Sequence, residues 1–176
     1  SMQAVYVPAD DFTDPAATHV FSHLSASVVL SRKRASEGFY PAIDPLKSTS
    51  VMLNPGIVGR RHYEIAQDVR RVLSEYEDLK DIIAMLGLEE LSTSDRATVA
   101  RARRLERFLT QPFYTTEAFT GTPGKLVRLE ETLQGCERLL AETHFQTPES
   151  AYYMIGGIAE ASEVKTEPEP QTVHGP

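Results

Sequence analysis

A long run of apolar residues at helical spacing, set between two glycines, constrains the fold of this chain more than any other feature. Between Gly59 and Gly87 the apolar residues recur at steps of three and four positions, which places them on one face of an amphipathic helix. The residues of this face are Tyr63, Ala66, Val69, Val72, Leu73, Tyr76, Leu79, Ile82, Ile83 and Leu86. Gly87 suits the end of such a helix, because glycine readily adopts the backbone conformation of a C-terminal cap. The pattern predicts one long helix over residues 59–86.

A second helix follows a polar link. Ser92 or Ser94 can cap its first turn, and it must end near Gln111, because Pro112 disfavours helical geometry in the residue before it. Its apolar face consists of Val99, Ala102, Leu105, Phe108 and Leu109.

The remaining apolar periodicity predicts a third helix and a short helical turn. The third helix is expected over residues 129–143. Its buried face consists of Leu133, Cys136, Leu139 and Leu140. The short helix should begin at Thr147 and Pro148, since proline suits the first helical position, and run through Tyr153 to two glycines.

The part of the chain before Gly59 has the character of short strands and loops. Apolar runs over residues 4–7 and 27–30 are typical of buried strands, and residues 38–45 form an extended stretch with two prolines. Two strands cannot make a stable sheet alone. The chain is therefore expected to be mainly α, a helical bundle preceded by the tail end of another domain.

Composition excludes several classes of protein. The 176 residues include 25 acidic and 18 basic side chains, for a net charge of -7, which argues against general nucleic-acid binding. The hydrophobic content of 41% permits a core, and no apolar run approaches the length of a membrane span. A lone cysteine rules out an internal disulfide. These values favour a protein that neither binds nucleic acid nor inserts into a membrane.

The stretch FTGTPGKLV, residues 119–127, resembles the start of a phosphate-binding loop, but its spacing is wrong. Such a loop needs a glycine, four intervening residues, then the Gly-Lys pair, followed by a hydroxyl residue. Phe119 and Leu126 occupy those two positions. A glycine-proline turn between helices is the better interpretation.

The other reactive residue types favour structural roles. His19 and His23 are spaced like metal ligands but lack a third ligand, so we expect no metal site. Cys136 lies on an apolar helix face with no partner, which indicates a buried thiol rather than a nucleophile. The arginines between residues 96 and 107 are expected to pair with carboxylates of the preceding helix. No catalytic residue is predicted.

Aromatic residues outside the helical pattern have two open interpretations. Phe39 and Tyr40 lie in one such stretch, and Phe113, Tyr114 and Phe119 lie in another. These side chains either fill the core or form a slot in which a flat ring stacks, as nucleic-acid bases stack on aromatic side chains. Composition alone does not choose between the two.

A series of motifs settles the class of protein by resemblance. In one order the chain contains QAVYVPADD, LSRKRASEGFYPAIDP, HYEIAQDVRRVL, LKDIIAMLGLEELS, ARARRLERFLTQPF, EAFTGTPGK and AYYMIGGI. Together they closely resemble the C-terminal part of the beta subunit of F-type ATP synthases. The resemblance runs over residues 3–158, and so many consecutive matches are more specific than any single motif.

The resemblance implies a fold and a function. Residues 1–58 are expected to be the incomplete end of an α/β nucleotide-binding domain, made of short strands and loops. Residues 59–160 would form the helical C-terminal domain, and residues 161–176, which are acidic and proline-rich, a disordered tail. In that family the subunit makes or hydrolyses ATP, with Mg²⁺, in a ring with alpha subunits around the central-stalk gamma subunit. It lies peripherally at the cytoplasmic face of the bacterial inner membrane or at an organelle inner membrane.

The resemblance also implies roles for individual residues. Tyr40 and Phe119 match the aromatics that enclose the adenine of ATP or ADP, and Phe113 matches the residue that closes that pocket. Tyr63 matches a neighbour of the noncatalytic nucleotide site shared with alpha. The residues that match contacts to the central stalk are Asp11, Thr13 and Asp14 above, and Glu89, Glu90, Leu91, Ser92 and Asp95 below.

The sequence differs from the family's pattern in the acidic turn, and it does not contain the family's catalytic segments. Thr93 and Ser94 stand where the family has carboxylates, which puts the strength of the stalk contact in doubt. The family's phosphate loop, magnesium ligands and water-activating glutamate lie upstream of Gln3, so this chain alone is expected to be inactive. The alternative is a stand-alone interaction module that docks on the ring or stalk without catalysis.

Overall fold

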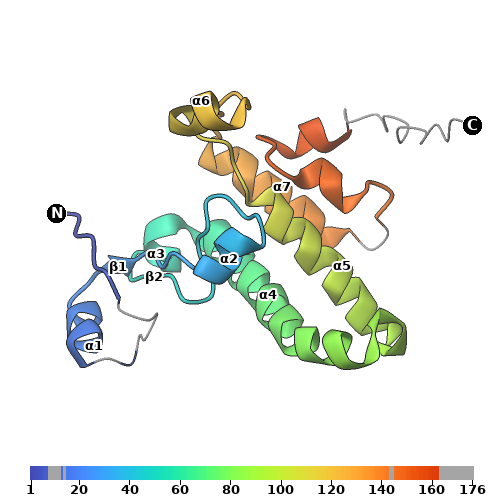
Figure 1. Cartoon of the computed structure of the whole chain (residues 1–176), viewed down its shortest axis with the longest axis horizontal. Coiled ribbons are helices and arrows are strands. Elements are labelled where there is room, and N and C mark those ends of the chain that lie inside the picture. Colours follow the sequence, from blue (N-terminus) through green and yellow to red (C-terminus); the bar gives the residue numbers. More distant parts are fainter. Residues whose placement is uncertain (8–12, 14, 143–144, 163–176) are drawn as a thin grey trace, which may run out of the picture.

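The computed structural model describes residues 1–7, 13, 15–142 and 145–162, and helices dominate this part of the chain (Figure 1). The α-helices are α1 (Pro15–Ser22), α2 (Arg32–Ser36), α3 (Pro55–Val58), α4 (Arg60–Leu86), α5 (Thr93–Phe108), α6 (Glu117–Thr120) and α7 (Leu129–Ala141). The 3-10 helices are η2 (Leu88–Glu90), η3 (Tyr114–Thr116), η4 (Glu149–Tyr152) and η5 (Ile158–Ser162). The strands are β1 (Ala26–Ser27) and β2 (Thr49–Ser50). The expectation of a mainly α chain is confirmed.

Helix α4 confirms the long helix predicted between the two glycines. Gly59 and Gly87 flank it with φ values of 85° and 87°, in a region of backbone conformation that favours glycine. Its buried residues are Ile65, Val69, Val72, Leu73 and Tyr76. Helix α5 begins where predicted, because the Ser92 hydroxyl accepts a hydrogen bond from the backbone N–H of Asp95 at 3.1 Å.

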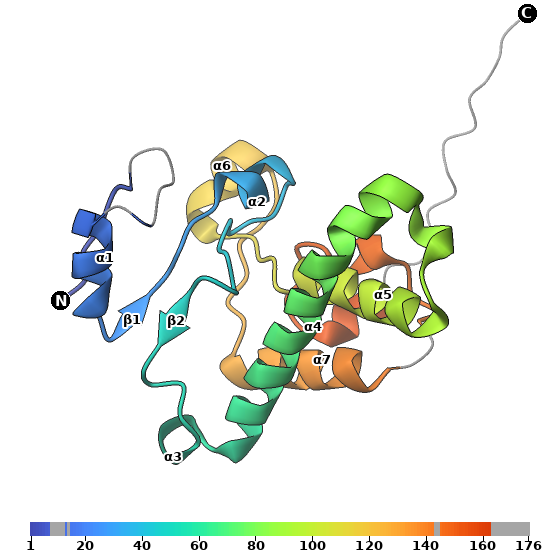
Figure 2. The ribbon, with the colours of Figure 1, turned by 90° about the horizontal axis from the view of Figure 1, so that it is seen from below.

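The C-terminal end of α4 differs from the predicted apolar face. Ile82 and Leu86 are exposed, with Leu86 at 63%. The reason is that α7 covers only the start of α4, where Arg61 pairs with Glu130 and Glu137 of α7. The far end of α4 extends beyond that cover before the chain turns into α5 (Figure 2).

The core lies where α4, α5 and α7 meet. Leu73 of α4 is 1% exposed, and Leu105 of α5 and Leu139 of α7 are completely buried. Helices α5 and α7 approach closely at Gly135, where an added Cβ would lie 2.1 Å from the Phe108 ring. The third predicted helix is therefore confirmed, with an end at Ala141 instead of residue 143.

After α7 the chain covers the bundle with two short 3-10 helices. The helix expected from residue 147 to 153 is the single turn η4, and η5 was not predicted. Residues 161 and 162, the first two of the predicted tail, belong to η5, and Ala161 is 4% exposed. The rest of that predicted tail, from residue 163, lies outside the described residues.

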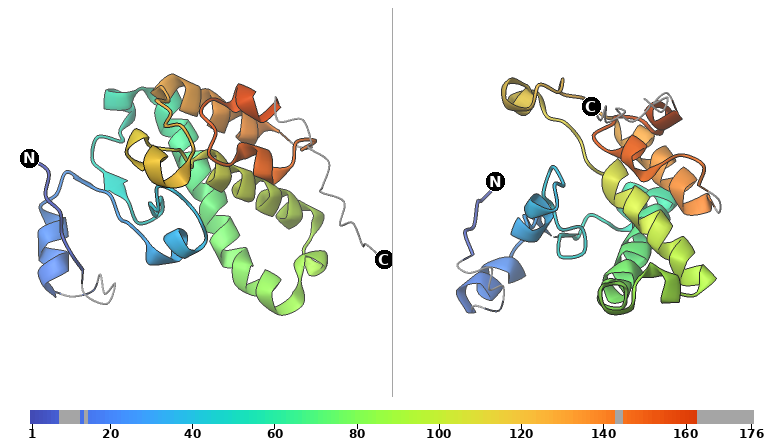
Figure 3. Two further views of the ribbon diagram at one scale, coloured as in Figure 1. Left: turned by 45° about the horizontal axis from the view of Figure 1, so that its top comes forward. Right: turned by 45° about the vertical axis from the view of Figure 1, so that its right-hand side comes forward.

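The N-terminal part packs on one side of the bundle (Figure 3). The predicted strand over residues 4–7 is absent, and the strand predicted over 27–30 is reduced to β1 and an isolated bridge between Leu30 and Ile43. Strand β1 pairs with β2 in antiparallel register, Ala26 opposite Ser50. Helices α1 and α2 were not predicted, because PAATHVFS and RKRAS are too short to show a helical period.

None of the helices in the described residues is both long and apolar enough to cross a membrane.

Candidate functional site

The aromatic residues Tyr40 and Phe113 meet at the junction between the N-terminal part and the bundle. Their ring centroids are 5.1 Å apart and the ring planes are inclined by 65°, an edge-to-face contact. The carbonyl oxygen of Tyr40 accepts a hydrogen bond from the Gln111 backbone N–H at 2.8 Å. Phe113 is 38% exposed, so part of this aromatic surface remains open to solvent.

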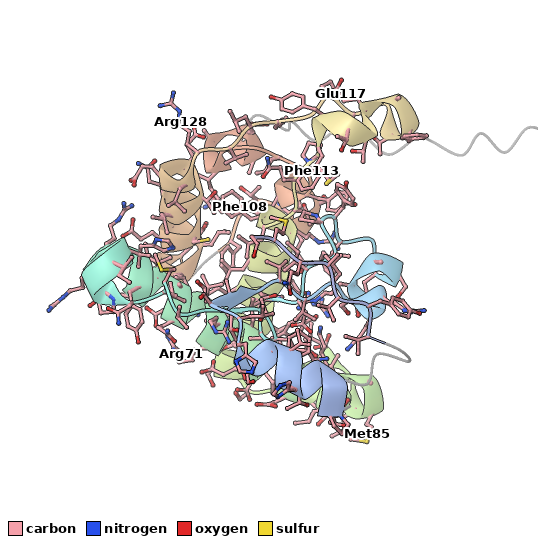
Figure 4. All side chains as sticks on the ribbon, turned by 90° about the vertical axis from the view of Figure 1, so that its left-hand side faces the viewer. Arg71, Met85, Phe108, Phe113, Glu117 and Arg128 are labelled. Carbon is pink, nitrogen blue, oxygen red and sulfur yellow. The ribbon has the colours of Figure 1, made fainter. Side chains whose placement is uncertain are left out.

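A loop that follows Pro112 carries the third predicted aromatic residue. Phe113 lies beneath α6, between that helix and the bundle (Figure 4). Phe119 lies on α6 itself and is 89% exposed. The structure therefore brings Tyr40 and Phe113 together and leaves the Phe119 ring in solvent.

The loop is closed at its base by hydrogen bonds. The Lys125 N–H donates to the Pro112 carbonyl at 3.0 Å, and the Gln111 side-chain amide donates to the Lys125 carbonyl. The Gly124 N–H donates to the Glu117 carboxylate at 2.6 Å. Glycine is required at position 124, because a Cβ there would lie 2.3 Å from the backbone nitrogen of Tyr114.

The Lys125 side chain of the FTGTPGK stretch is paired with a carboxylate. Its ammonium donates to the Glu160 carboxylate, which also accepts from the backbone N–H groups of Gly156 at 3.1 Å and Gly157 at 3.2 Å. Burial raises the pKa of Glu160, but the hydrogen bond and charge of Lys125 and the two backbone donors outweigh burial and lower it overall. This contact fastens the loop to η5.

The N-terminal part is held on the bundle by charged groups that sequence analysis did not single out. The Arg70 guanidinium donates to the carbonyls of Pro45 and Ser48, each at 2.9 Å, and of Leu46 at 3.0 Å. Arg34 of α2 pairs with Glu106 of α5. The sequence carries no local signal for these contacts, because the partners lie on distant segments.

The predicted stalk residues in the acidic turn between α4 and α5 differ in their exposure and in their contacts. Glu89 and Glu90 are exposed in η2. Leu91 points into the core at 6% exposure, and the Ser92 hydroxyl is bonded to the Asp95 carboxylate at 2.7 Å. Glu89 and Glu90 thus contribute exposed carboxylates to this predicted contact.

The other predicted residues lie apart from these groups. Tyr63 is half-buried in the first turn of α4. Thr13 is exposed, whereas Asp11 and Asp14 lie outside the described residues. Cys136 is buried, and burial raises the pKa of its thiol to about 12, which disfavours the reactive thiolate.

Two further observations concern ligands. Within the residues that the structure describes, no three His, Cys, Asp or Glu side chains cluster as a metal site requires. A hollow of about 350 Å³ is lined by the 29–34 segment together with Asp44, Lys47 and Glu77, and neither Tyr40 nor Phe113 lines it.

Family models match both parts of the chain. The model described as ATP synthase alpha/beta family, nucleotide-binding domain, matches residues 1–50. The model described as C-terminal domain of V and A type ATP synthase matches residues 52–149.

Individual relatives agree with these matches. The chain is 74% identical over 160 residues to ATP synthase subunit beta 1 of Dinoroseobacter shibae, covering 91% of this chain and 35% of that protein. It is 71% identical over 167 residues to ATP synthase subunit beta 2 of Polaromonas naphthalenivorans, covering 95% of this chain and 35% of that protein. The chain thus spans about a third of the length of the curated relatives it matches.

A solved structure shares the fold. The ATP synthase subunit NeqB from Nanoarcheaum equitans superimposes with a TM-score of 0.64 over 79% of this chain and 34% of that one, at 21% sequence identity. The two family models, the relatives and the helical architecture agree with one another. The chain belongs to the ATP synthase alpha/beta family and matches the C-terminal part of its beta subunits.

Proposed function

We propose that this chain works as the C-terminal part of the catalytic beta subunit of an F-type ATP synthase. In that role it supplies the aromatic wall of the adenine site and the contact through which nucleotide binding is coupled to ion transport. The observation that carries the proposal is the contact of Tyr40 with Phe113, because it joins an aromatic residue of each family segment at one place. Residues 1–58 would complete the nucleotide-binding domain, and residues 59–160 would form the helical domain.

The proposed aromatic wall, made of Tyr40, Phe113 and Phe119, suits a flat base and not a phosphate. Aromatic faces stack on bases, and Tyr40, Phe113 and the exposed Phe119 offer such surface. Lys125, the cation nearest in sequence to Phe119 on its C-terminal side, is already paired with Glu160. The phosphates and Mg²⁺ of ATP or ADP would therefore be held by the remainder of the subunit.

Nucleotide binding by the full-length subunit tests the adenine wall. Removing one stacking ring should weaken ADP binding by about 5- to 150-fold, since a stacked base contributes roughly 1–3 kcal/mol. We expect this loss for Tyr40→Ala and for Phe119→Ala in titration calorimetry. Tyr114→Ala is the matched control, because Tyr114 is an exposed aromatic of the same loop at 63%. Equal affinities for all of these variants would refute the assignment.

The isolated chain should not hydrolyse ATP, because phosphoryl transfer depends on positioned phosphates and metal. We expect no Mg²⁺-dependent phosphate release and ATP affinity weaker than micromolar. Turnover that disappears in Tyr40→Ala would contradict this. The alternative, a non-catalytic module that docks on the ring or stalk, would be favoured by a native polypeptide of 176 residues in the source cells.

The acidic turn is proposed to contact the central-stalk gamma subunit. Carboxylates facing a basic surface attract it without deep interlocking, which permits sliding, and Glu89 and Glu90 are exposed as this requires. Thr13 would belong to a second stalk contact, together with Asp11 and Asp14. Tyr63 would border the noncatalytic site shared with alpha. The assembled enzyme would lie peripherally at the cytoplasmic face of a bacterial inner membrane, or at an organelle inner membrane.

Neutralising the acidic turn should uncouple the two activities of the assembled enzyme. We expect Glu89→Gln, Glu90→Gln and Asp95→Asn together to reduce ATP-driven ion pumping more than ATP hydrolysis. A matched triple variant, Glu64→Gln with Asp78→Asn and Asp81→Asn, neutralises exposed carboxylates of α4. Unchanged pumping in the first variant, or equal losses in both, would refute the coupling role.

A further inference from the structure

A buried ion pair joins the segment that carries Tyr40 to helix α5. Arg34 of α2 and Glu106 of α5 are only 7% and 8% exposed, although they lie 72 positions apart in the sequence. An Nη1 hydrogen of Arg34 is donated to the Glu106 carboxylate. Burying either charge alone is costly, so each group depends on the other for neutralisation.

The surrounding charges link α2 to both α4 and α5. The Glu106 carboxylate also lies 3.8 Å from the Lys80 ammonium of α4, and that ammonium pairs with Glu77 at 2.7 Å. Lys33 and Arg34 of α2 approach Glu77 to 3.7 and 3.9 Å. If α2 moved away, the buried Glu106 carboxylate would lose Arg34, and the Lys80 ammonium that remains 3.8 Å from it would still be paired with Glu77.

The same arginine also orders the backbone that leads to Tyr40. Its carbonyl accepts a hydrogen bond from the Phe39 N–H at 3.0 Å, and its guanidinium lies 5.2 Å from the centroid of the Phe39 ring. Tyr40 follows directly and is bonded through its carbonyl to Gln111. Glu106 and Gln111 lie at the C-terminal end of α5 and just beyond it, so one short stretch of chain holds both contacts.

We propose that Arg34 and Glu106 are positioning residues that hold the Tyr40 segment on α5, so that the aromatic wall moves together with the helical bundle. The contacts of Arg34 and Tyr40 attach this segment to α5 whatever ligand the aromatic residues hold. The consequence of this attachment for nucleotide binding rests on the proposed adenine site. Separation of α2 from α5 would take the Arg34 guanidinium away from the buried Glu106 carboxylate, so positions of the Tyr40 segment away from α5 are disfavoured.

Hydrogen exchange of the Gln111 amide reports on the contact, because that amide donates to Tyr40. In Arg34→Met and in Glu106→Gln we expect its exchange to accelerate by about tenfold or more, since each variant leaves one charge buried without its partner. Exchange of the Leu105 and Leu139 amides should stay as in the parent chain. Arg71→Met is the matched control, because Arg71 forms exposed ion pairs on α4 at 59% side-chain exposure.

The double variant separates pairing from general destabilisation. Arg34→Met combined with Glu106→Gln removes both charges, so its Gln111 exchange should be slower than the product of the two single effects predicts. Glu106→Asp keeps the charge and provides a second single variant if another fails to fold. Unchanged Gln111 exchange, or equal acceleration of Leu105, Leu139 and Gln111, would overturn the proposal.

ADP affinity of the full-length subunit distinguishes failure of this inference from failure of the proposed function. We expect Glu106→Gln to weaken ADP binding severalfold, in the same direction as Tyr40→Ala. If Tyr40→Ala has no effect while Gln111 exchange accelerates in Glu106→Gln, the adenine assignment fails and the positioning contact stands. If Tyr40→Ala weakens binding and Glu106→Gln does not, the positioning role in nucleotide binding is refuted.

Discussion

Glu160 illustrates how a single side chain can join two distant parts of the chain. It accepts hydrogen bonds from Lys125 in the aromatic loop and from the backbone of Gly156 and Gly157. The carboxylate form makes all of these contacts favourably, which is why the net effect is a lowered pKa despite burial. The contact between the loop and η5 therefore depends on the charge of the Glu160 carboxyl group.

Stability should depend on pH through this carboxyl group. Its pKa in the folded chain lies below the ordinary value of 4.5, so the stabilisation is present above 4.5 and is lost as the pH falls through the folded pKa. In urea unfolding, the difference between the parent chain and Glu160→Gln should be steady from about pH 7 to about pH 5 and shrink below that. Glu37→Gln, an exposed carboxylate after α2, is the control. A difference that grows on acidification would contradict the assignment.

The packing of α5 against α7 leaves little space between the two helices. Helices α5 and α7 come together where Gly135 faces Phe108, with no room for a methyl group between them. The apolar periodicity predicted both helices, since contacts three and four residues apart are local. The close approach at Gly135 was not predictable, because it depends on which residue of α5 lies opposite.

Gly135→Ala should therefore destabilise the bundle. Alanine favours a helix over glycine by about 1 kcal/mol, but the added Cβ would lie 2.1 Å from the Phe108 ring. Overpacking of this kind costs about 1–3 kcal/mol, so we expect a net decrease in the free energy of unfolding and a lower melting temperature. Combining the change with Phe108→Leu should recover part of the loss.

Gly157→Ala is the matched control for that experiment, since nothing lies within 4 Å of a Cβ added there. A Gly135→Ala chain that melts at or above the parent temperature would show that the helices separate at little cost.

The whole molecule has an apolar core in the bundle and a largely polar attachment of the N-terminal part. The continuous core of buried residues draws on positions between Ile65 and Ala161. Among the described residues before α4, Val29 is the buried apolar side chain. Polar contacts of Arg70, the Arg34–Glu106 pair and the Tyr40–Gln111 bond hold the N-terminal part on the bundle. They are joined there by the Tyr40–Phe113 ring contact and by Leu46, which is partly buried against the core.

This difference predicts that the N-terminal part opens before the bundle unfolds. Pairing of β1 with β2 involves only two residues from each strand, and so short a sheet has little stability of its own. Under increasing urea, hydrogen exchange of the Ser31 and Asp44 amides should accelerate at lower concentrations than that of Leu73 and Leu105. Loss of protection at one common concentration would show instead a single cooperative unit.

Arg70→Met should increase the difference between the urea concentrations at which the N-terminal part and the bundle lose protection. The reason is that Arg70 binds three carbonyls of the N-terminal part. Arg71→Met is the control, since the neighbouring Arg71 pairs with the exposed carboxylates of Asp68 and Glu75 on α4. Equal differences in the two variants would argue against an attachment through Arg70.

The sequence by itself determined the long helices, their glycine and serine boundaries, and the family. These depend on local spacing, on residues with special backbone or capping properties, and on long runs of matching motifs. It also identified the Gly-Lys turn as unsuited to phosphate. The short helices α1, α2 and α6 escaped detection, because a helix of one or two turns is stabilised by its surroundings more than by its own period.

Only the tertiary structure decided which side chains are buried and which distant residues meet. The apolar face predicted for α4 included Leu86, which is exposed, and omitted Ile65, which is buried, because the extent of α7 sets what is covered. Tyr40 meets Phe113, and Arg34 meets Glu106, across segments with no shared local pattern. Such contacts follow from how the chain folds back on itself, and the pairing of buried charges has no signature in either segment alone.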